Sequence, residues 1–153
     1  MSVYFQEGIV KSEDLIVAKI ADDLFQLSPP SPMWPATACV YVVVDNGSFS
    51  LIDVGCGRAD AIGRLKAGLT QLGLDFTSLK TLVLSHAHPD HMGAAEMLLG
   101  QYAPEVLIHT DDVDHARDPR GLIGTFDIEL ATGLYGKAEG IVKDLFSFFD
   151  GSG

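Results

Sequence analysis

Apolar and polar positions divide the first third of the chain into short extended segments. Residues 15–27 form two apolar runs separated by the acidic segment 21–23, which predicts two strands joined by a tight turn. Residues 38–44 are dense in β-branched side chains, and Asn46-Gly47 supplies the positive φ angles of a two-residue turn before the run 48–53. The pattern therefore predicts two successive β-hairpins.

Downstream of residue 53 the pattern changes to alternating helix and strand. Apolar residues recur at helical spacing over residues 59–72 and stop at Gly73. Residues 81–84 form a short, wholly apolar strand of the kind that is buried on both faces. The segments that follow are predicted in turn as helix, strand, short helical turn and final helix: 93–99, 105–109, 111–116 and 141–149. No repeat or shift in composition marks a second domain.

Composition narrows the class of partner. The 153 residues carry a net charge of −11, which repels phosphate backbones and anionic membranes, so nucleic acid and membrane partners are disfavoured and a small-molecule substrate is expected. The two cysteines, Cys39 and Cys56, do not form a disulfide framework, and no leader or membrane-length apolar run is visible. We expect a soluble cytoplasmic protein.

One loop carries the chemistry: His86-Ala87-His88-Pro89-Asp90-His91. In an extended stretch alternate side chains point the same way, so His86 and His88 can bind one ion, and Pro89 helps to turn Asp90 and His91 toward a neighbouring one. Imidazole and carboxylate suit zinc, with iron or manganese as alternatives. A metal-bound water, oriented by Asp90 or losing its proton to Asp90, would become a hydroxide that hydrolyses a polarised carbonyl or phosphoryl group.

Surface capping or pairing with acids is the ordinary role of an isolated histidine, but four metal-capable residues within six positions favour a metal site. The strand expected before the loop and the helix expected after it supply the structural context that such a motif requires.

The loop resembles the HxHxDH signature of the metallo-β-lactamase superfamily, and the stretch Leu51-Ile52-Asp53-Val54-Gly55 resembles that family's upstream strand-and-turn motif. The resemblance implies an α+β fold, the four-layer αββα sandwich, of which this chain supplies mainly the first αβ half. It also implies two zinc ions in the complete site, with His86 and His88 binding the first, Asp90 and His91 the second, and Asp53 supporting a ligand. Without the resemblance, Asp53 is equally well explained as a strand-end carboxylate that accepts backbone hydrogen bonds.

Within the family the chain resembles the glyoxalase II and lactonase branches, which implies a metal-dependent hydrolase of an ester, thioester or lactone. An iron-dependent oxidoreductase of the sulfur dioxygenase type is the first alternative. The second is a non-catalytic, truncated half-domain with a partial metal site.

The family completes its site with a later histidine, a bridging aspartate and a last histidine, and none of these is identifiable here. Only His109 and His115 follow the loop, and both are interpreted as structural. We therefore expect residues 1–153 to be a single domain that lacks its carboxy-terminal part. Because a half-sandwich exposes an apolar sheet face, the expected partner is the missing half or a second copy of the chain.

Two further elements are candidates for shaping the site. The segment 28–35 contains four prolines and must be a loop; in this family such a loop would place Trp34 over the metals as a substrate wall, although core packing of Trp34 is equally consistent with the sequence. Gly55 and Gly57 would let the backbone turn close to the histidine loop, as glycines also do in other loops that precede helices.

Overall fold

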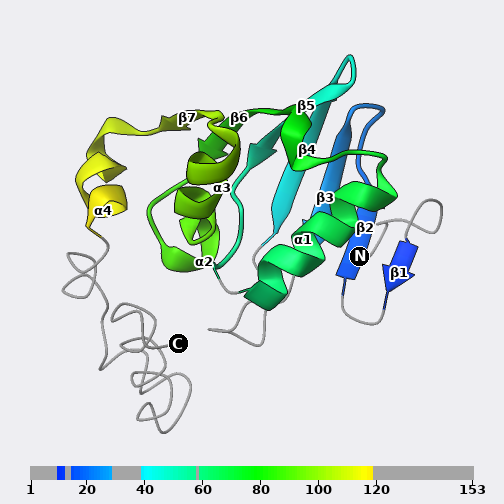
Figure 1. Cartoon of the computed structure of the whole chain (residues 1–153), viewed down its shortest axis with the longest axis horizontal. Helices are drawn as coiled ribbons and strands as arrows, with labels where there is room; N and C mark the ends of the chain where they lie inside the picture. Colours follow the sequence, from blue (N-terminus) through cyan, green and yellow to red (C-terminus); the bar gives the residue numbers. More distant parts are fainter. Residues whose placement is uncertain (1–9, 13–14, 29–38, 58, 119–153) are drawn as a thin grey trace, which may run out of the picture.

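The computed structural model describes residues 10–12, 15–28, 39–57 and 59–118. In this part of the chain a sheet of seven strands is formed, in the order of the sequence. The strands are β1 (Val10–Ser12), β2 (Leu15–Lys19), β3 (Leu24–Ser28), β4 (Val40–Asp45), β5 (Ser48–Ile52), β6 (Leu79–Leu84) and β7 (Glu105–Ile108) (Figure 1).

The described helices follow β5 and are interspersed with the last two strands. They are α1 (Ala59–Gln71), the 3-10 turn η1 (Phe76–Ser78), α2 (Pro89–Met92), α3 (Ala95–Tyr102), the 3-10 turn η2 (Thr110–Asp112) and α4 (Val113–Arg117). The predicted alternation of strands and helices after the hairpins is therefore confirmed, and the fold is α+β.

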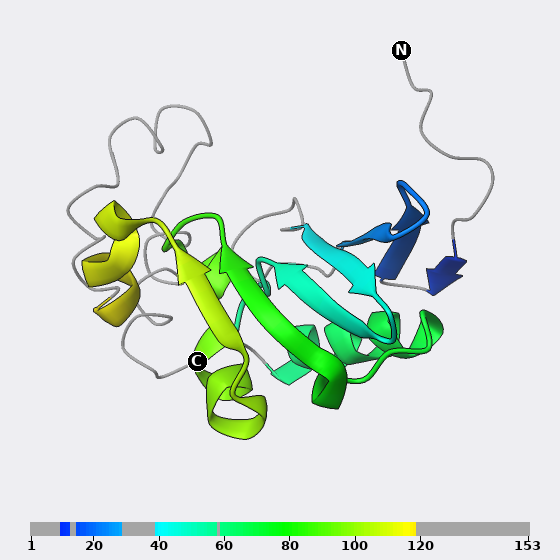
Figure 2. The ribbon, with the colours of Figure 1, turned by 90° about the horizontal axis from the view of Figure 1, so that it is seen from above.

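The sheet is mixed. Strands β1 to β5 pair antiparallel, whereas β6 lies parallel to both β5 and β7. The parallel pairs require crossover connections, and these contain α1 and α3, which lie on the same face of the sheet (Figure 2). Because β5 and β6 are parallel neighbours, their carboxyl ends lie at one edge of the sheet, and the loops that carry Asp53 and His86 start there.

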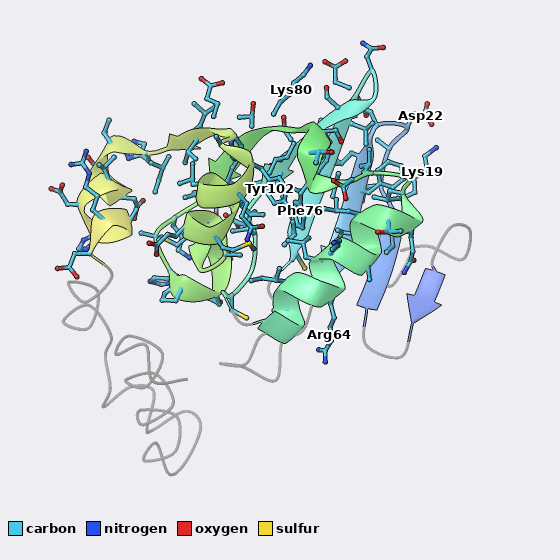
Figure 3. All side chains as sticks on the ribbon, in the orientation of Figure 1. Lys19, Asp22, Arg64, Phe76, Lys80 and Tyr102 are labelled. Carbon is cyan, nitrogen blue, oxygen red and sulfur yellow. The ribbon has the colours of Figure 1, made fainter. Side chains whose placement is uncertain are left out.

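The hydrophobic core fills the space between the sheet and these helices. Leu65 and Leu69 of α1 are almost completely buried in the same cluster as Leu27, Val42 and Phe49 from the sheet. At the end of the core nearest α3, the rings of Phe76 and Tyr102 stack with their centroids 5.4 Å apart (Figure 3). These contacts hold α1 and α3 against the parallel strands.

The opposite face of the sheet is only partly covered by the described residues. Along β6, Leu82 and Leu84 are buried, but Thr81 and Val83 are only half-buried. The expectation that this strand is buried on both faces is therefore wrong for the described part of the chain, since α1 and α3 cover one face alone (Figure 2).

Most of the predicted elements are confirmed. The acidic turn joins β2 to β3, where Lys19 and Asp22 form an exposed ion pair of 2.9 Å (Figure 3), and Asn46 and Gly47 adopt positive φ angles of 48° and 83° between β4 and β5. Helix α1 ends two residues before Gly73, which has a φ angle of 71°. Trp34, its proline loop and the expected final helix lie outside the described residues.

The helix expected over residues 93–99 has a different arrangement. A one-turn helix, α2, already begins at Pro89 and ends with Gly93 as its C-cap, and α3 follows from Ala95. Proline at the first position of a helix loses no hydrogen bond there and presets φ, so Pro89 starts a helix as readily as it turns an extended chain.

In the described part of the chain, no helix has both the length and the apolar character needed to cross a membrane.

The end of α3 offers a test of the backbone geometry. Ala103 caps this helix with φ 49° and ψ 47°, a left-handed conformation that an L side chain disfavours. We expect Ala103→Gly to raise the free energy of unfolding by about 1 kcal/mol, measured by urea denaturation. The matched control is Ala67→Gly on the exposed side of α1, which should instead lower it by roughly 0.5–1 kcal/mol. A loss of stability in Ala103→Gly would contradict the assigned conformation.

Candidate metal centre

The histidine loop leaves the carboxyl end of β6 and passes directly into α2. Ser85 follows the last residue of the strand, and His88 is the N-cap of α2 with extended φ and ψ angles of −72° and 141°. The extended part of the loop is therefore confirmed for His88. Asp90 and His91 instead lie in the first turn of a helix, where a carboxylate is favoured by the helix dipole.

The structure brings three imidazoles together. The ring centroid of His86 lies 4.6 Å from that of His88 and 4.0 Å from that of His91. All three side chains are half-buried, so they are sheltered but open to one side. Residues predicted to bind two different ions thus form a single cluster.

Asp53 lies beneath this cluster at the end of β5. Asp53 is buried, with 6% of its surface exposed. Its backbone has a φ of 60°, which is rare for a residue other than glycine and points to a local requirement for that conformation. Its amide still donates to the carbonyl of Val83 at 2.8 Å, so the backbone stays attached to β6 while the side chain turns under the histidine loop.

The Asp53 carboxylate accepts three hydrogen bonds from the loop. Oδ1 accepts from the Ser85 backbone N–H at 2.8 Å, and Oδ2 accepts from the Ser85 hydroxyl at 2.7 Å and from His91 Nδ1 at 2.8 Å. A buried carboxylate with several donors is the arrangement that keeps a charged group stable. It also ties both ends of the loop to one point.

These hydrogen bonds fix which ring nitrogen carries the proton. Ser85 has one hydroxyl proton and gives it to Asp53, so its oxygen must accept from His86 Nδ1, which lies 2.9 Å away. His91 likewise donates from Nδ1 to the carboxylate. In a neutral imidazole the other nitrogen then holds the lone pair. His86 and His91 therefore present Nε2 as the metal-binding atom.

The Asp90 carboxylate lies beside one of these nitrogens. Its Oδ2 is 3.6 Å from His91 Nε2, too far for a hydrogen bond. Two ligand atoms bound at about 2.1 Å to one tetrahedral ion lie roughly 3.4 Å apart. The spacing therefore suits an oxygen and a nitrogen that share an ion.

The environment of His86 favours the neutral form of its imidazole. Partial burial lowers the pKa of its imidazole below 6.5, and the neighbouring His91 and His88 lower the pKa further, against the opposing effect of Asp53 and Asp90. A neutral imidazole is the form that binds a metal.

The donors fit a divalent metal in kind, but the described part of the chain holds no group of three or more His, Cys, Asp or Glu side chains gathered for one ion. Imidazoles with fixed tautomers and an adjacent carboxylate are what zinc sites use. A complete coordination shell is not assembled among residues 10–12, 15–28, 39–57 and 59–118.

The two later histidines lie outside this cluster of contacts. His109 follows β7 and accepts a hydrogen bond from the Asp111 backbone N–H at Nδ1, and its side chain is 68% exposed. His115 is in α4. Ser85, in contrast, is a site residue that sequence reasoning missed. The available signal was a hydroxyl directly between the strand and the first histidine.

Comparison with known proteins identifies the fold family. The model of the metallo-beta-lactamase superfamily matches residues 34–150, well over half of the chain. The chain belongs to the metallo-beta-lactamase superfamily. The predicted αββα fold class is thereby confirmed, with this chain supplying part of the sandwich. A comparison with curated protein sequences found no match.

Solved superfamily structures show the same fold over part of their length. A metallo-beta-lactamase family protein from Thermus thermophilus is 29% identical, with a TM-score of 0.61 over 70% of this chain and 36% of that one. The FEZ-1 metallo-beta-lactamase from Legionella gormanii is 25% identical, with a TM-score of 0.54 over 63% of this chain and 34% of that one. A metallo-beta-lactamase from Erythrobacter litoralis, 17% identical, has a TM-score of 0.58 over 72% and 48%. The chain thus spans between a third and a half of these superfamily structures.

Replacing the shared carboxylate tests its role. In Asp53→Asn the side-chain nitrogen cannot accept a hydrogen bond, so the side chain can no longer accept all three hydrogen bonds that Ser85 and His91 now donate to Oδ1 and Oδ2. We expect zinc affinity, measured by competition with a chromophoric chelator, to fall roughly tenfold to a hundredfold. Asp111→Asn, on the exposed η2 turn, is the control. Equal affinities in all three proteins would rule out a supporting role for Asp53.

The lowered pKa of His86 predicts a pH dependence of stability. Below pH 6.5 the unfolded chain takes up a proton at this residue more readily than the folded chain, so stability falls as the pH drops through this range. Urea denaturation of the metal-free chain at pH 7.5 and 5.5 should therefore show a smaller loss in His86→Asn than in the unmodified chain. A loss of the same size in both would show that His86 does not contribute.

Proposed function

We propose that this superfamily chain carries the histidine loop of a metal-dependent hydrolase that acts on an ester, thioester or lactone. The observation that supports this most is the hydrogen-bonded unit of Asp53, Ser85, His86 and His91, which leaves Nε2 of both imidazoles available on a half-buried surface. The proposal is also supported by the superfamily match, because the matched residues 34–150 include all four of these residues.

Each residue of the loop has a proposed role. His86 and His88 would hold one metal ion, and Asp90 and His91 a second, with Asp53 orienting His91 directly and His86 through Ser85. Zinc is the preferred metal because imidazole and carboxylate are its usual ligands, and iron or manganese is the alternative. When bound, such a metal polarises a substrate carbonyl and lowers the pKa of water.

Asp90 is the proposed catalytic residue. Its side chain is 17% exposed and lies beside His91 Nε2, so one carboxylate oxygen can face the ion while the other accepts a proton. Asp90 would thereby hold the proton that a hydrolytic step releases.

Charge and composition shape the proposed substrate and setting. A net charge of −11 disfavours nucleic acid and supports a small-molecule substrate, for which Trp34 is proposed as a wall. Cys39 and Cys56 form no disulfide in the described part of the chain, in keeping with a proposed cytoplasmic location.

A second candidate is a non-catalytic half-domain with a partial metal site. It is favoured by the lack, among the described residues, of any gathered group of three ligating side chains. The chain also covers no more than 48% of the neighbours compared above. Under this alternative the loop would bind metal weakly without turnover.

Removing one ligand separates these functions. The full chain loaded with zinc should hydrolyse members of a thioester and lactone panel, and His88→Ala should reduce turnover by at least about a hundredfold, since a direct ligand is lost. The control is His115→Ala in α4, which should retain full activity.

Turnover that survives His88→Ala would contradict the proposed site. Zinc binding without turnover would reject hydrolysis by this chain and support the half-domain. Oxygen uptake by the iron-loaded chain in place of hydrolysis would favour a sulfur dioxygenase type of reaction.

A further inference from the structure

The backbones of Gly57 and Gly93 touch, although 36 positions separate them in the sequence. A β-carbon on Gly57 would lie 2.5 Å from the carbonyl oxygen of Gly93 and 3.1 Å from its carbonyl carbon. A β-carbon on Gly93 would lie 2.5 Å from the Gly57 nitrogen and 2.5 Å from the carbonyl oxygen of Pro89. Neither position can take any side chain unless backbone atoms move.

These two positions require glycine because there is no room for a β-carbon, and not because the backbone adopts an unusual conformation. Gly93 has φ −58° and ψ −30°, a right-handed helical geometry open to every residue, and Gly57 is not among the positive-φ glycines. Gly47 and Gly73 show the opposite case, since both have a positive φ and nothing within 4 Å of an added β-carbon. The pair 57 and 93 therefore serves close approach of two chain segments.

The contact lies at the end of a short ladder between the loop after β5 and the end of the histidine loop. Val54 N–H donates to the His91 carbonyl at 2.8 Å, and Ala94 N–H donates to the Gly55 carbonyl at 3.3 Å. A side-chain hydrogen bond from His91 Nδ1 to Asp53 Oδ2 joins the same two segments. An added methyl group at position 57 would push this ladder apart.

We infer that Gly57 and Gly93 are positioning residues that set the distance between Asp53 and His91 and so aim His91 Nε2. The inference rests on the proposed function, in which Asp90 and His91 hold a metal ion. Ser85 is hydrogen-bonded to Asp53, and His86 to Ser85, from the β6 side and outside this ladder, so a disturbance at position 57 acts first on His91.

The test compares Gly57→Ala with the unmodified full chain. We expect zinc affinity, measured by chelator competition, to fall about tenfold, as for other losses of a group that orients a ligand. In the metal-free protein we also expect the nitrogen chemical shifts of His91 to show a mixture of both tautomers, whereas those of His86 keep the proton on Nδ1. The second readout does not depend on any metal.

Two control variants distinguish a loss of positioning from a general loss of stability. Leu69→Ala truncates a buried side chain of α1 and lowers stability, but it should leave the His91 shifts and the zinc affinity unchanged. Gly63→Ala replaces a glycine with open space around it and should change neither quantity. Equal losses of zinc affinity in Gly57→Ala and Leu69→Ala would overturn the inference.

A measurement on the unmodified chain covers the case in which Gly57→Ala fails to fold. The amides of Val54 and Ala94 should exchange with solvent roughly a hundredfold or more slowly than in an unfolded chain, because the ladder protects them. Rapid exchange at both would overturn the inference. If the unmodified chain binds no zinc while His91 still responds to Gly57→Ala, the proposed function fails and the positioning role stands.

Discussion

The carboxylate of Asp53 is the group on which the geometry of the candidate site depends. It is buried, its backbone is held in a left-handed conformation, and it accepts hydrogen bonds from Ser85 and His91. An ionised carboxylate can only accept hydrogen bonds, so Ser85 and His91 must be the donors to Asp53. That constraint, and not the histidines alone, determines that His86 and His91 offer Nε2.

The fold places this carboxylate by means of parallel pairing. Asp53 follows β5 and Ser85 follows β6, and because these strands are parallel neighbours the two residues meet at one edge of the sheet. Helices α1 and α3 on a single face supply the core that keeps the strands in register (Figures 1 and 2). The superfamily match covers the segment that contains both strands. The chain covers no more than half of the superfamily structures compared above.

The features that depend on a few adjacent residues are predictable from the sequence. Asn46-Gly47 defined a hairpin, Gly73 the end of α1, and the histidine loop the candidate metal ligands, because turn chemistry and donor type are properties of a few adjacent residues. The start of α2 at Pro89 was missed because proline is compatible with both a turn and the first position of a helix. The contact of Gly57 with Gly93 could not be predicted, since the space around a glycine depends on how distant segments pack.

The most direct test of this account is a long-range proton–nitrogen NMR spectrum of the histidine-labelled full chain, recorded without metal and during a zinc titration. The hydrogen bonds of Ser85 and Asp53 predict that His86 and His91 carry the proton on Nδ1 in the metal-free chain and that their Nε2 signals shift when zinc is added. Protons on Nε2 in the metal-free chain, or Nε2 signals that zinc leaves unchanged, would contradict it.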